Sequence, residues 1–208
     1  MSVPTVITAP TIYPVSLSEA KDQLRVSGTD DEDALIDLYI EAATEWYEGQ
    51  TSRATYEQTL EHILGVFPAS DTIFLPRATP LQSITSLKYK DSDGTETTWA
   101  AGNYIANTDS IPGALTRAYG ISWPSFTPYP VSPIRIRYVA GMTSTSPISE
   151  APAALKIPIM LLIGGLFENR ENVVVSDRGA VSQIAILCGA QAYMNLASHY
   201  YGMTQFEF

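Results

Sequence analysis

The period of the hydrophobic residues changes twice along the chain, and this limits the folds that it can adopt. Segments toward both ends carry helical patterns, whereas the segment from Tyr56 to Val139 is built of short runs typical of strands. In the clearest run, Ile134, Ile136 and Tyr138 fall on one face of a strand. The arginines between them fall on the other face. The pattern predicts an α+β chain with a small antiparallel sheet between helical parts.

Two helices are predicted before the strand-rich segment. Ser16 and Glu19 have the spacing of a capping box, so a helix should run from Leu17 to Val26 and end at Ser27-Gly28. A second helix, capped by Thr29 or Asp30, should run to about Glu48, with Gly49 at its C-cap. Its predicted apolar face consists of Leu35, Leu38, Tyr39, Ala42 and Trp46.

Two further helices are predicted after the strands. The third should open at Glu150-Ala151-Pro152 and run to about Glu171, with a kink at Pro158 or a start delayed to it. The pair Gly164-Gly165 would let another backbone approach closely. A loop is expected over Asn172–Gly179, and a fourth helix over Val181–Tyr201.

The strand-rich segment is divided by turn residues. Strands are predicted over Thr72–Leu75, Ile84–Tyr89, Thr95–Trp99 and Ile134–Tyr138. Asp91–Gly94 should form the hairpin turn between the second and third of these, because Asp-Gly tolerates positive φ.

Prolines and aromatic residues crowd the stretch Ala118–Gly141, AYGISWPSFTPYPVSPIRIRYVAG. Proline fixes φ, so this stretch should form a rigid loop that leads into the last strand. Two interpretations remain open. The rings of Trp123, Phe126 and Tyr129 serve as anchors at an interface, or Tyr119 and Trp123 cover the sheet of their own subunit.

The negative charge lies in the N-terminal part. The formal net charge is −10, and residues 1–61 hold 12 acidic and 3 basic residues, a balance of −9. Binding of duplex DNA by charge neutralisation needs clustered Lys and Arg, which the chain lacks. Asp37, Glu41, Glu45 and Glu48 fall on one face of the second helix. This face is either an ordinary solvated surface or an acidic surface that faces a molecule to which the protein must not bind.

The sequence contains no motif for nucleotide, metal or covalent chemistry. His62 and His199 are isolated from other metal ligands, and the single cysteine, Cys188, fits a buried small hydrophobe. We expect no catalysis, no cofactor and no metal. The N-terminus lacks the pattern of a signal peptide, and the apolar run Ile157–Phe167 is too short to span a membrane.

Six pieces of the chain, in this order and spacing, carry a family resemblance. They are YPVSLSEAKDQLRV, DDEDALIDLYIEAATEWYEGQTSRA, IFLPRATPLQSITSLKYKDSDGT, AYGISWP, IRIRYVAG and LFENRENVV. With them the chain resembles the longer head–tail connector proteins of tailed bacteriophages, also called head completion or adaptor proteins. The resemblance implies a helical bundle (residues 1–55 and 148–208) with a β-rich insertion (residues 56–147).

The resemblance also implies a structural role without catalysis. Such connectors form a ring, usually dodecameric, beneath the portal protein after DNA packaging, extend the DNA channel, and seat the stopper or tail-completion proteins. The chain would be made in the cytoplasm of the host bacterium and reside at the head–tail interface of the virion. Two departures are the interrupted third helix and the ending YYGMTQFEF, where relatives often have a basic tail.

Two sets of residues are predicted to carry this role. Asp37, Glu41 and Glu45 would line the channel, where an acidic wall keeps DNA mobile. Subunit or partner contacts are expected at Tyr119, Trp123, Phe126, Tyr129, Gly164, Gly165, Arg170, Tyr200 and Tyr201. The alternative function is a tail or baseplate module that binds a host-surface glycan through exposed Trp99, Trp123 and Tyr129.

Overall fold

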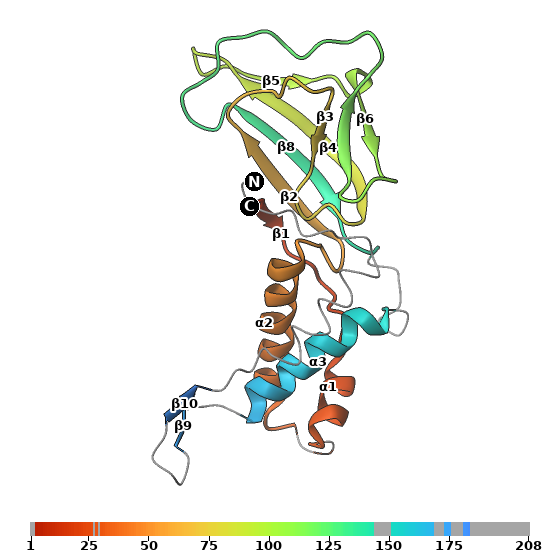
Figure 1. Ribbon diagram of the computed structural model, residues 1–208, viewed down its shortest axis with the longest axis vertical. Coiled ribbons are helices and arrows are strands. Elements are labelled where there is room, and N and C mark those ends of the chain that lie inside the picture. The colour runs from red at the N-terminus through yellow and green to blue at the C-terminus, as the bar shows by residue number, and fades with distance from the viewer. Residues whose placement is uncertain are drawn as a thin grey trace. The chain divides into compact units, whose positions relative to one another are not determined.

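The computed structural model describes residues 3–26, 28, 30–143, 151–168, 173–175 and 181–183 (Figure 1). The chain divides into two compact units. The β unit consists of Met1–Thr11 and Ser52–Ser144, and the helical unit consists of Ile12–Thr51 and Thr145–Phe208.

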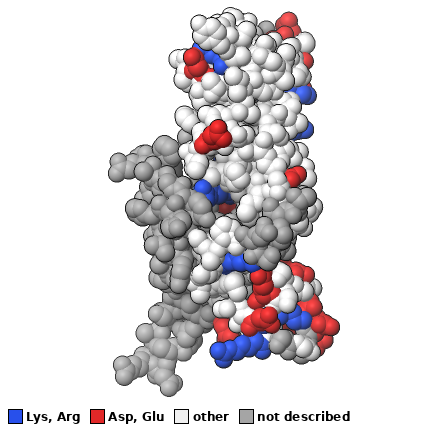
Figure 2. Space-filling view, turned by 90° about the vertical axis from the view of Figure 1, so that its right-hand side faces the viewer, with Lys and Arg blue, Asp and Glu red and all other residues white. Residues whose placement is uncertain are grey.

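The two units differ in charge. Among the described residues, acidic residues outnumber basic ones by 11 to 3 in the helical unit, whereas the β unit has 7 of each. In Figure 2 most red atoms gather over the helical unit at the bottom, and the β unit shows a largely white surface. The acidity that the sequence places in the N-terminal part therefore belongs to the helical unit.

The β unit contains two antiparallel sheets. The five-stranded sheet has the order β1-β2-β8-β4-β5, and the three-stranded sheet has the order β3-β7-β6. A short 3-10 helix, Ala101–Asn103, precedes β6. The strands are β1 (Thr5–Thr8), β2 (Gln58–Leu64), β3 (Thr72–Phe74), β4 (Leu81–Lys90), β5 (Glu96–Trp99), β6 (Tyr104–Asn107), β7 (Ala114–Arg117) and β8 (Ile134–Ala140).

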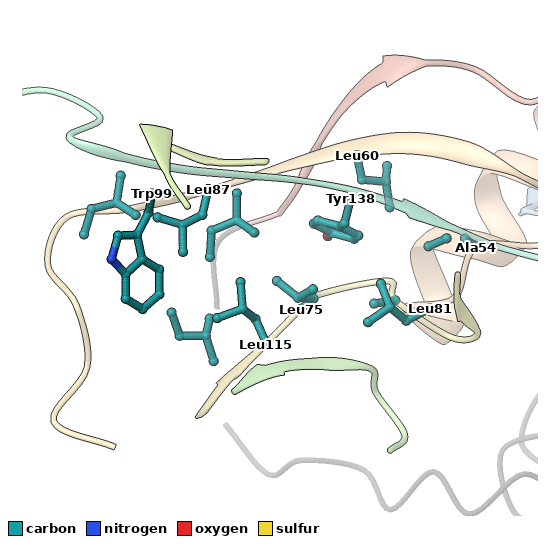
Figure 3. Close-up of a cluster of buried hydrophobic side chains, with 13 residues drawn as sticks. Ala54, Leu60, Leu75, Leu81, Leu87, Trp99, Leu115 and Tyr138 are labelled. Carbon is teal, nitrogen blue, oxygen red and sulfur yellow. The ribbon is translucent and has the colours of Figure 1, made fainter. Parts of the chain in front are cut away.

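The core of the β unit is formed by the inward faces of these strands (Figure 3). The predicted alternation in β8 is confirmed, because Ile134, Ile136 and Tyr138 are fully buried. They pack in one cluster with Leu60 of β2 and Leu115 of β7. Complete burial of one such aliphatic side chain contributes about 1.5 to 3 kcal/mol. The Tyr138 hydroxyl donates a hydrogen bond to the carbonyl oxygen of Pro76, so its one polar group is satisfied.

Turn chemistry at Asp91 closes the β4–β5 hairpin as predicted. The Asp91 carboxylate accepts from the amides of Asp93 and Thr95 at 3.1 and 2.9 Å, and Gly94 has φ of 85°. Only glycine takes such a backbone conformation without steric cost. The local sequence therefore determines this hairpin.

The first helix of the helical unit is α1 (Leu17–Leu24), and its predicted capping box is present. The Ser16 hydroxyl accepts from the Glu19 amide at 3.2 Å, and the Ser16 amide donates to the Glu19 carboxylate at 3.0 Å. The helix ends two residues earlier than predicted. Arg25, with φ of 58°, is its C-cap in the left-handed conformation.

The second helix, α2 (Asp33–Thr51), runs through Gly49, which was predicted to end it. Its predicted apolar face is right only for Tyr39 and Trp46, which are partly buried against the helical core. The buried face consists of Ile36, Ile40, Ala43, Thr44, Tyr47, Glu48 and Thr51, whereas Leu38 is 57% exposed. The sequence places two apolar stripes side by side on this helix. The stripe that packs against α1 and α3 lies one residue further along the chain than the predicted stripe.

The third helix, α3 (Ala153–Glu168), begins before Pro158 rather than at it. Amides of Leu155 and Lys156 donate to the Pro152 carbonyl at 2.9 and 3.1 Å, so Pro152 precedes the first turn, where its missing amide costs nothing. The Lys156 ammonium contacts the Glu19 carboxylate at 2.6 Å and ties α3 to α1. Ile159 and Ile163 are fully buried against α2 residues.

The predicted helical bundle with a small inserted sheet is wrong. Three helices, the two larger sheets and a hairpin are seen among the described residues, with about equal helix and strand content. The hairpin pairs β9 (Val173–Val175) with β10 (Val181–Gln183), so the predicted loop over Asn172–Gly179 contains a strand and the predicted fourth helix does not begin at Val181. The strands β1, β2, β6 and β7 were also missed. They are short or carry charged residues, and β1, β2 and β7 have partners far away in the sequence, whereas β6 pairs with the next strand, β7.

Candidate interaction surfaces

The aromatic loop between β7 and β8 is fastened to the β unit's own core. The Trp123 ring stacks on Phe67 with centroids 4.9 Å apart and planes 7° apart, and its indole N–H donates to the Ser70 carbonyl at 2.9 Å. Phe126 packs on Phe67 and Tyr89 at 6.0 and 4.9 Å. These two predicted interface residues therefore cover their own subunit in the free chain.

The far end of the loop is held by the β4–β5 hairpin. The Tyr129 amide donates to the Lys90 carbonyl at 3.1 Å, and the Lys90 ammonium lies 4.1 Å from the centre of the Tyr129 ring. A glycan platform would need Trp99, Trp123 and Tyr129 to present open faces to solvent. Trp99 is only 8% exposed, and one face of the Trp123 ring is stacked on Phe67. The three rings therefore do not form a glycan platform.

Tyr119 differs from the other aromatic residues of the loop because its side chain is fully exposed. It stands on a turn in which the Ile121 amide donates to the Ala118 carbonyl at 3.1 Å, with Gly120 at φ of 76°. The Ala118 amide donates to Asn103 at 2.9 Å. An exposed ring on an anchored turn loses little entropy when a partner covers it.

Three of the four acidic residues predicted to form one exposed face of α2 are exposed. Asp37, Glu41 and Glu45 are exposed, but Glu48 is 4% exposed and belongs to the buried face. Burial, together with the Glu41 carboxylate, raises the pKa of the Tyr13 hydroxyl beside this face. The three exposed carboxylates therefore form a row along the helix, one turn apart.

Two of the three described cations of the helical unit are engaged away from that row. Lys21 pairs with Asp33 at 2.7 Å and with Asp30 at 3.2 Å, and Lys156 pairs with Glu19. The hydrogen bond that the Lys21 ammonium donates to the Asp33 carboxylate raises the pKa of Lys21. Among the residues that the structure describes, no ion pair to Asp37, Glu41 or Glu45 is seen, so the row keeps its negative potential.

The glycine pair lies near the end of α3. A Cβ at Gly164 would meet no atom of the described chain within 4 Å, so nothing in the subunit itself requires glycine there. Contact with another chain therefore remains a prediction for Gly164 and Gly165. The other predicted contact residues, Arg170, Tyr200 and Tyr201, lie outside the described residues.

The outer faces of the two sheets differ, which the sequence analysis missed. The outer face of the five-stranded sheet carries Lys88, Arg135, Arg137, Glu61 and Glu96, joined in ion pairs. In the three-stranded sheet Ile73 and Leu115 face the core, so alternation turns Phe74, Thr116 and Ile105 outward. This outer face carries no charged residue, and Phe74 and Ile105 are more than half exposed. The uncharged sequences of β3 (TIF) and β6 (YIAN) could have indicated this face.

The described residues offer no arrangement for metal chemistry, since no three His, Cys, Asp or Glu side chains gather among them. The helices in the described part of the chain are also too short or too polar to cross a membrane. The surfaces above are suited to contacts between macromolecules.

We compared the chain with known proteins. No curated protein matches the chain. Solved structures that share the fold include a chain of the virion of a native gene transfer agent particle (24% identity, TM-score 0.69, 94% of each chain covered) and one of the neck of an empty particle (23% identity, TM-score 0.70, 92% of this chain and 95% of that chain).

A third similar chain comes from the neck of a native gene transfer agent particle reconstructed with C12 symmetry, with 23% identity and a TM-score of 0.64 over 92% of this chain and 94% of that one. The family model of phage gp6-like head-tail connector proteins matches residues 14–117, which is half of the sequence and spans parts of both units. The chain therefore belongs to the phage gp6-like head-tail connector family.

Proposed function

We propose that this connector assembles into a ring beneath the portal protein, joins capsid to tail and extends the DNA channel. The observation that carries the proposal is the match of the family model, together with a fold shared over nearly the whole chain with neck chains. The necks of the empty and the native particle were reconstructed with C6 and C12 symmetry, which fits a cyclic assembly of identical subunits.

A cyclic ring needs two different contact faces on each subunit. The anchored Tyr119 turn, the uncharged face of the β3-β7-β6 sheet and the open side of Gly164 are available for them. No contact among the described residues of the subunit explains any of these three features. The portal above and a stopper or tail-completion protein below are the further partners of this proposal.

The acidic row of α2 supports a DNA-repelling wall in the channel. Asp37, Glu41 and Glu45 are exposed, and the helical unit has a large excess of acidic residues. A ring repeats the row in every subunit, so the potential of a narrow channel becomes strongly negative and DNA slides through without binding.

Mass photometry of the purified chain, alone and mixed with its cognate portal, tests the ring. We expect a discrete complex of one portal with a ring of this chain, even if the chain alone is a monomer. A chain that stays monomeric and unbound in the presence of the portal contradicts the proposal.

Charge reversal tests the channel wall separately. Asp37→Lys, Glu41→Lys and Glu45→Lys together should make the portal–connector complex retain linear DNA at low salt, whereas the wild-type complex releases it. The matched control reverses three exposed acids of the β unit, Glu57, Asp93 and Asp109, with the same change in net charge. Equal DNA retention by both triple variants would show that the α2 row does not face the DNA.

A further inference from the structure

The hairpin β9–β10 is a sheet of only two short strands. Val173, Val174 and Val175 pair with Gln183, Ser182 and Val181 in antiparallel register. Within the described residues neither strand continues one of the larger sheets. A two-stranded sheet of this size is at best marginally stable in water, and a third strand is what normally stabilises it.

Exposed edges of sheets pair with other chains unless charge, proline or a bulge prevents it. Three of the four terminal strands in the β unit have such protection. β1 has a register shift between Val6 and Thr8, β5 begins with Glu96 in its ion pair with Lys88, and β3 has only three residues and ends just before Leu75-Pro76.

The fourth terminal strand, β6, has none of these protections. Its sequence is Tyr-Ile-Ala-Asn, and it pairs regularly with β7 over four consecutive residues. The strand is half-buried or exposed throughout, with Ile105 58% exposed on the uncharged outer face. Its free edge is the place in the β unit where another strand can add at the lowest cost.

We propose that the hairpin β9–β10 of one copy adds to the β6 edge of a second copy, with β9 beside β6. Both partners are uncharged, and the three valines of β9 have high strand propensity. The addition turns the order β3-β7-β6 into a five-stranded sheet. Backbone hydrogen bonds supply the contact and also give the hairpin its missing third strand.

The donor hairpin and the acceptor edge belong to different units of the chain. Each copy therefore gives one hairpin and receives another, which makes the contact heterologous. Contacts of this kind close into rings when the rotation fits. The inference rests on the proposed ring and names two of the elements that join its subunits.

Disulfide trapping tests the contact. In a Cys188→Ser background, Ile105→Cys is combined in turn with Val173→Cys, Val174→Cys and Val175→Cys, because neighbouring strands bring Cα atoms within disulfide range. We expect at least one pair to give a ladder of intermolecular products when the complex with the portal is oxidised. The control combines the same hairpin cysteines with Thr98→Cys on the exposed β5 edge, and should give at least tenfold less product.

The outcomes separate this inference from the proposed function. A ring that forms with the portal but gives no ladder overturns the strand addition and leaves the ring intact. A cross-link within one chain also overturns it, because the hairpin then occupies its own subunit. The same oxidation is applied to the chain without portal, and a ladder from a chain that does not bind the portal supports the strand addition and contradicts the role beneath the portal.

A charge placed on the edge gives a second measurement. Ile105→Lys should reduce ring assembly at least tenfold, while Thr98→Lys on β5 leaves it unchanged. Circular dichroism and the thermal transition should match the wild type in both variants. A folded Ile105→Lys protein that assembles normally contradicts the proposal.

Discussion

At Gly141 the chain leaves β8 in a conformation that other residues rarely adopt. Its φ is 102°, and a Cβ there would lie 2.1 Å from the carbonyl oxygen of Tyr56. The Gly141 carbonyl accepts from the side-chain amide of Gln82 at 2.8 Å, and the Gly141 amide donates to the Pro80 carbonyl at 2.8 Å, so the backbone is held on both sides. Neither the strain nor the clash can be relieved by a side-chain rotation.

We therefore predict that Gly141→Ala lowers the free energy of unfolding by about 3 kcal/mol. The measurement is urea denaturation followed by tryptophan fluorescence in a Trp46→Phe background, which leaves Trp99 and Trp123, both in the β unit. Gly102→Ala is the control, because a Cβ there meets no atom within 4 Å. Equal stability of the two variants would disprove the role of Gly141.

Glu19 links the capping box of α1 to α3. Burial alone would raise the pKa of its carboxyl, but hydrogen bonds from Lys156 and Ser16 outweigh burial and hold the pKa below its ordinary value of 4.5. Since the folded state favours the ionised form, this stabilisation is present above pH 4.5 and is lost as the pH falls through the lowered pKa.

Glu19→Gln should therefore cost roughly 0.5 to 1 kcal/mol at pH 7, because the pair is partly exposed. The cost should vanish at acid pH, where the wild type loses the same charge. Thermal unfolding between pH 3 and pH 7 measures this difference. Asp37→Asn, at an exposed position of α2, should follow the wild-type profile. A constant offset at every pH would contradict the assignment.

At the scale of elements, α2 shows which of two adjacent stripes faces the core. Ile36 is fully buried, whereas Leu38 is largely exposed. We predict that Ile36→Ala costs about 3 kcal/mol and that Leu38→Ala changes stability by less than about 0.5 kcal/mol. Denaturation followed by far-ultraviolet circular dichroism reports on this unit, because α1, α2 and α3 belong to it. The reverse ranking would restore the face that the sequence predicted.

In the loop after β7, Trp123 anchors the loop to its own subunit, whereas Tyr119 is proposed to contact a partner. Trp123→Ala removes a ring stack and an indole hydrogen bond, so it should destabilise the β unit by about 2 kcal/mol. Tyr119→Ala should leave the stability of the free subunit unchanged and weaken assembly with the portal at least tenfold. Thermal unfolding and mass photometry together distinguish the two effects. Normal assembly of Tyr119→Ala would remove this residue from the interface.

Local signals predicted the parts of the fold that local chemistry determines. The Ser16–Glu19 capping box, the Asp91 turn and the buried face of β8 follow from a few neighbouring residues. Pairing between distant segments does not. β2 pairs with β8 across about 70 to 80 residues of sequence, and the short strand β7 pairs with β3 across about 40 residues.

The candidate surfaces were predictable to the same degree. The exposed row of Asp37, Glu41 and Glu45 could be read from helical spacing. The division of the loop aromatics into anchors and an exposed Tyr119 could not, because it depends on Phe67 and Ser70, which lie about fifty residues away. The uncharged outer face of the β3-β7-β6 sheet could not be predicted either, because it depends on the register of three strands.

At the scale of the whole molecule, an acidic helical unit and an electrically balanced β unit alternate along one chain. This division suits a ring subunit in which one unit meets the negative charge of DNA and the other supplies uncharged contact surface. The family membership gives the connector role, and the surfaces described above are the proposed means of assembly.

Electron cryomicroscopy of the neck in assembled particles tests this account most directly. The account predicts a closed ring of this chain directly beneath the portal, with the α2 row of Asp37, Glu41 and Glu45 lining the channel. A neck map without this chain, or one in which it binds as single subunits outside the channel, would contradict the account.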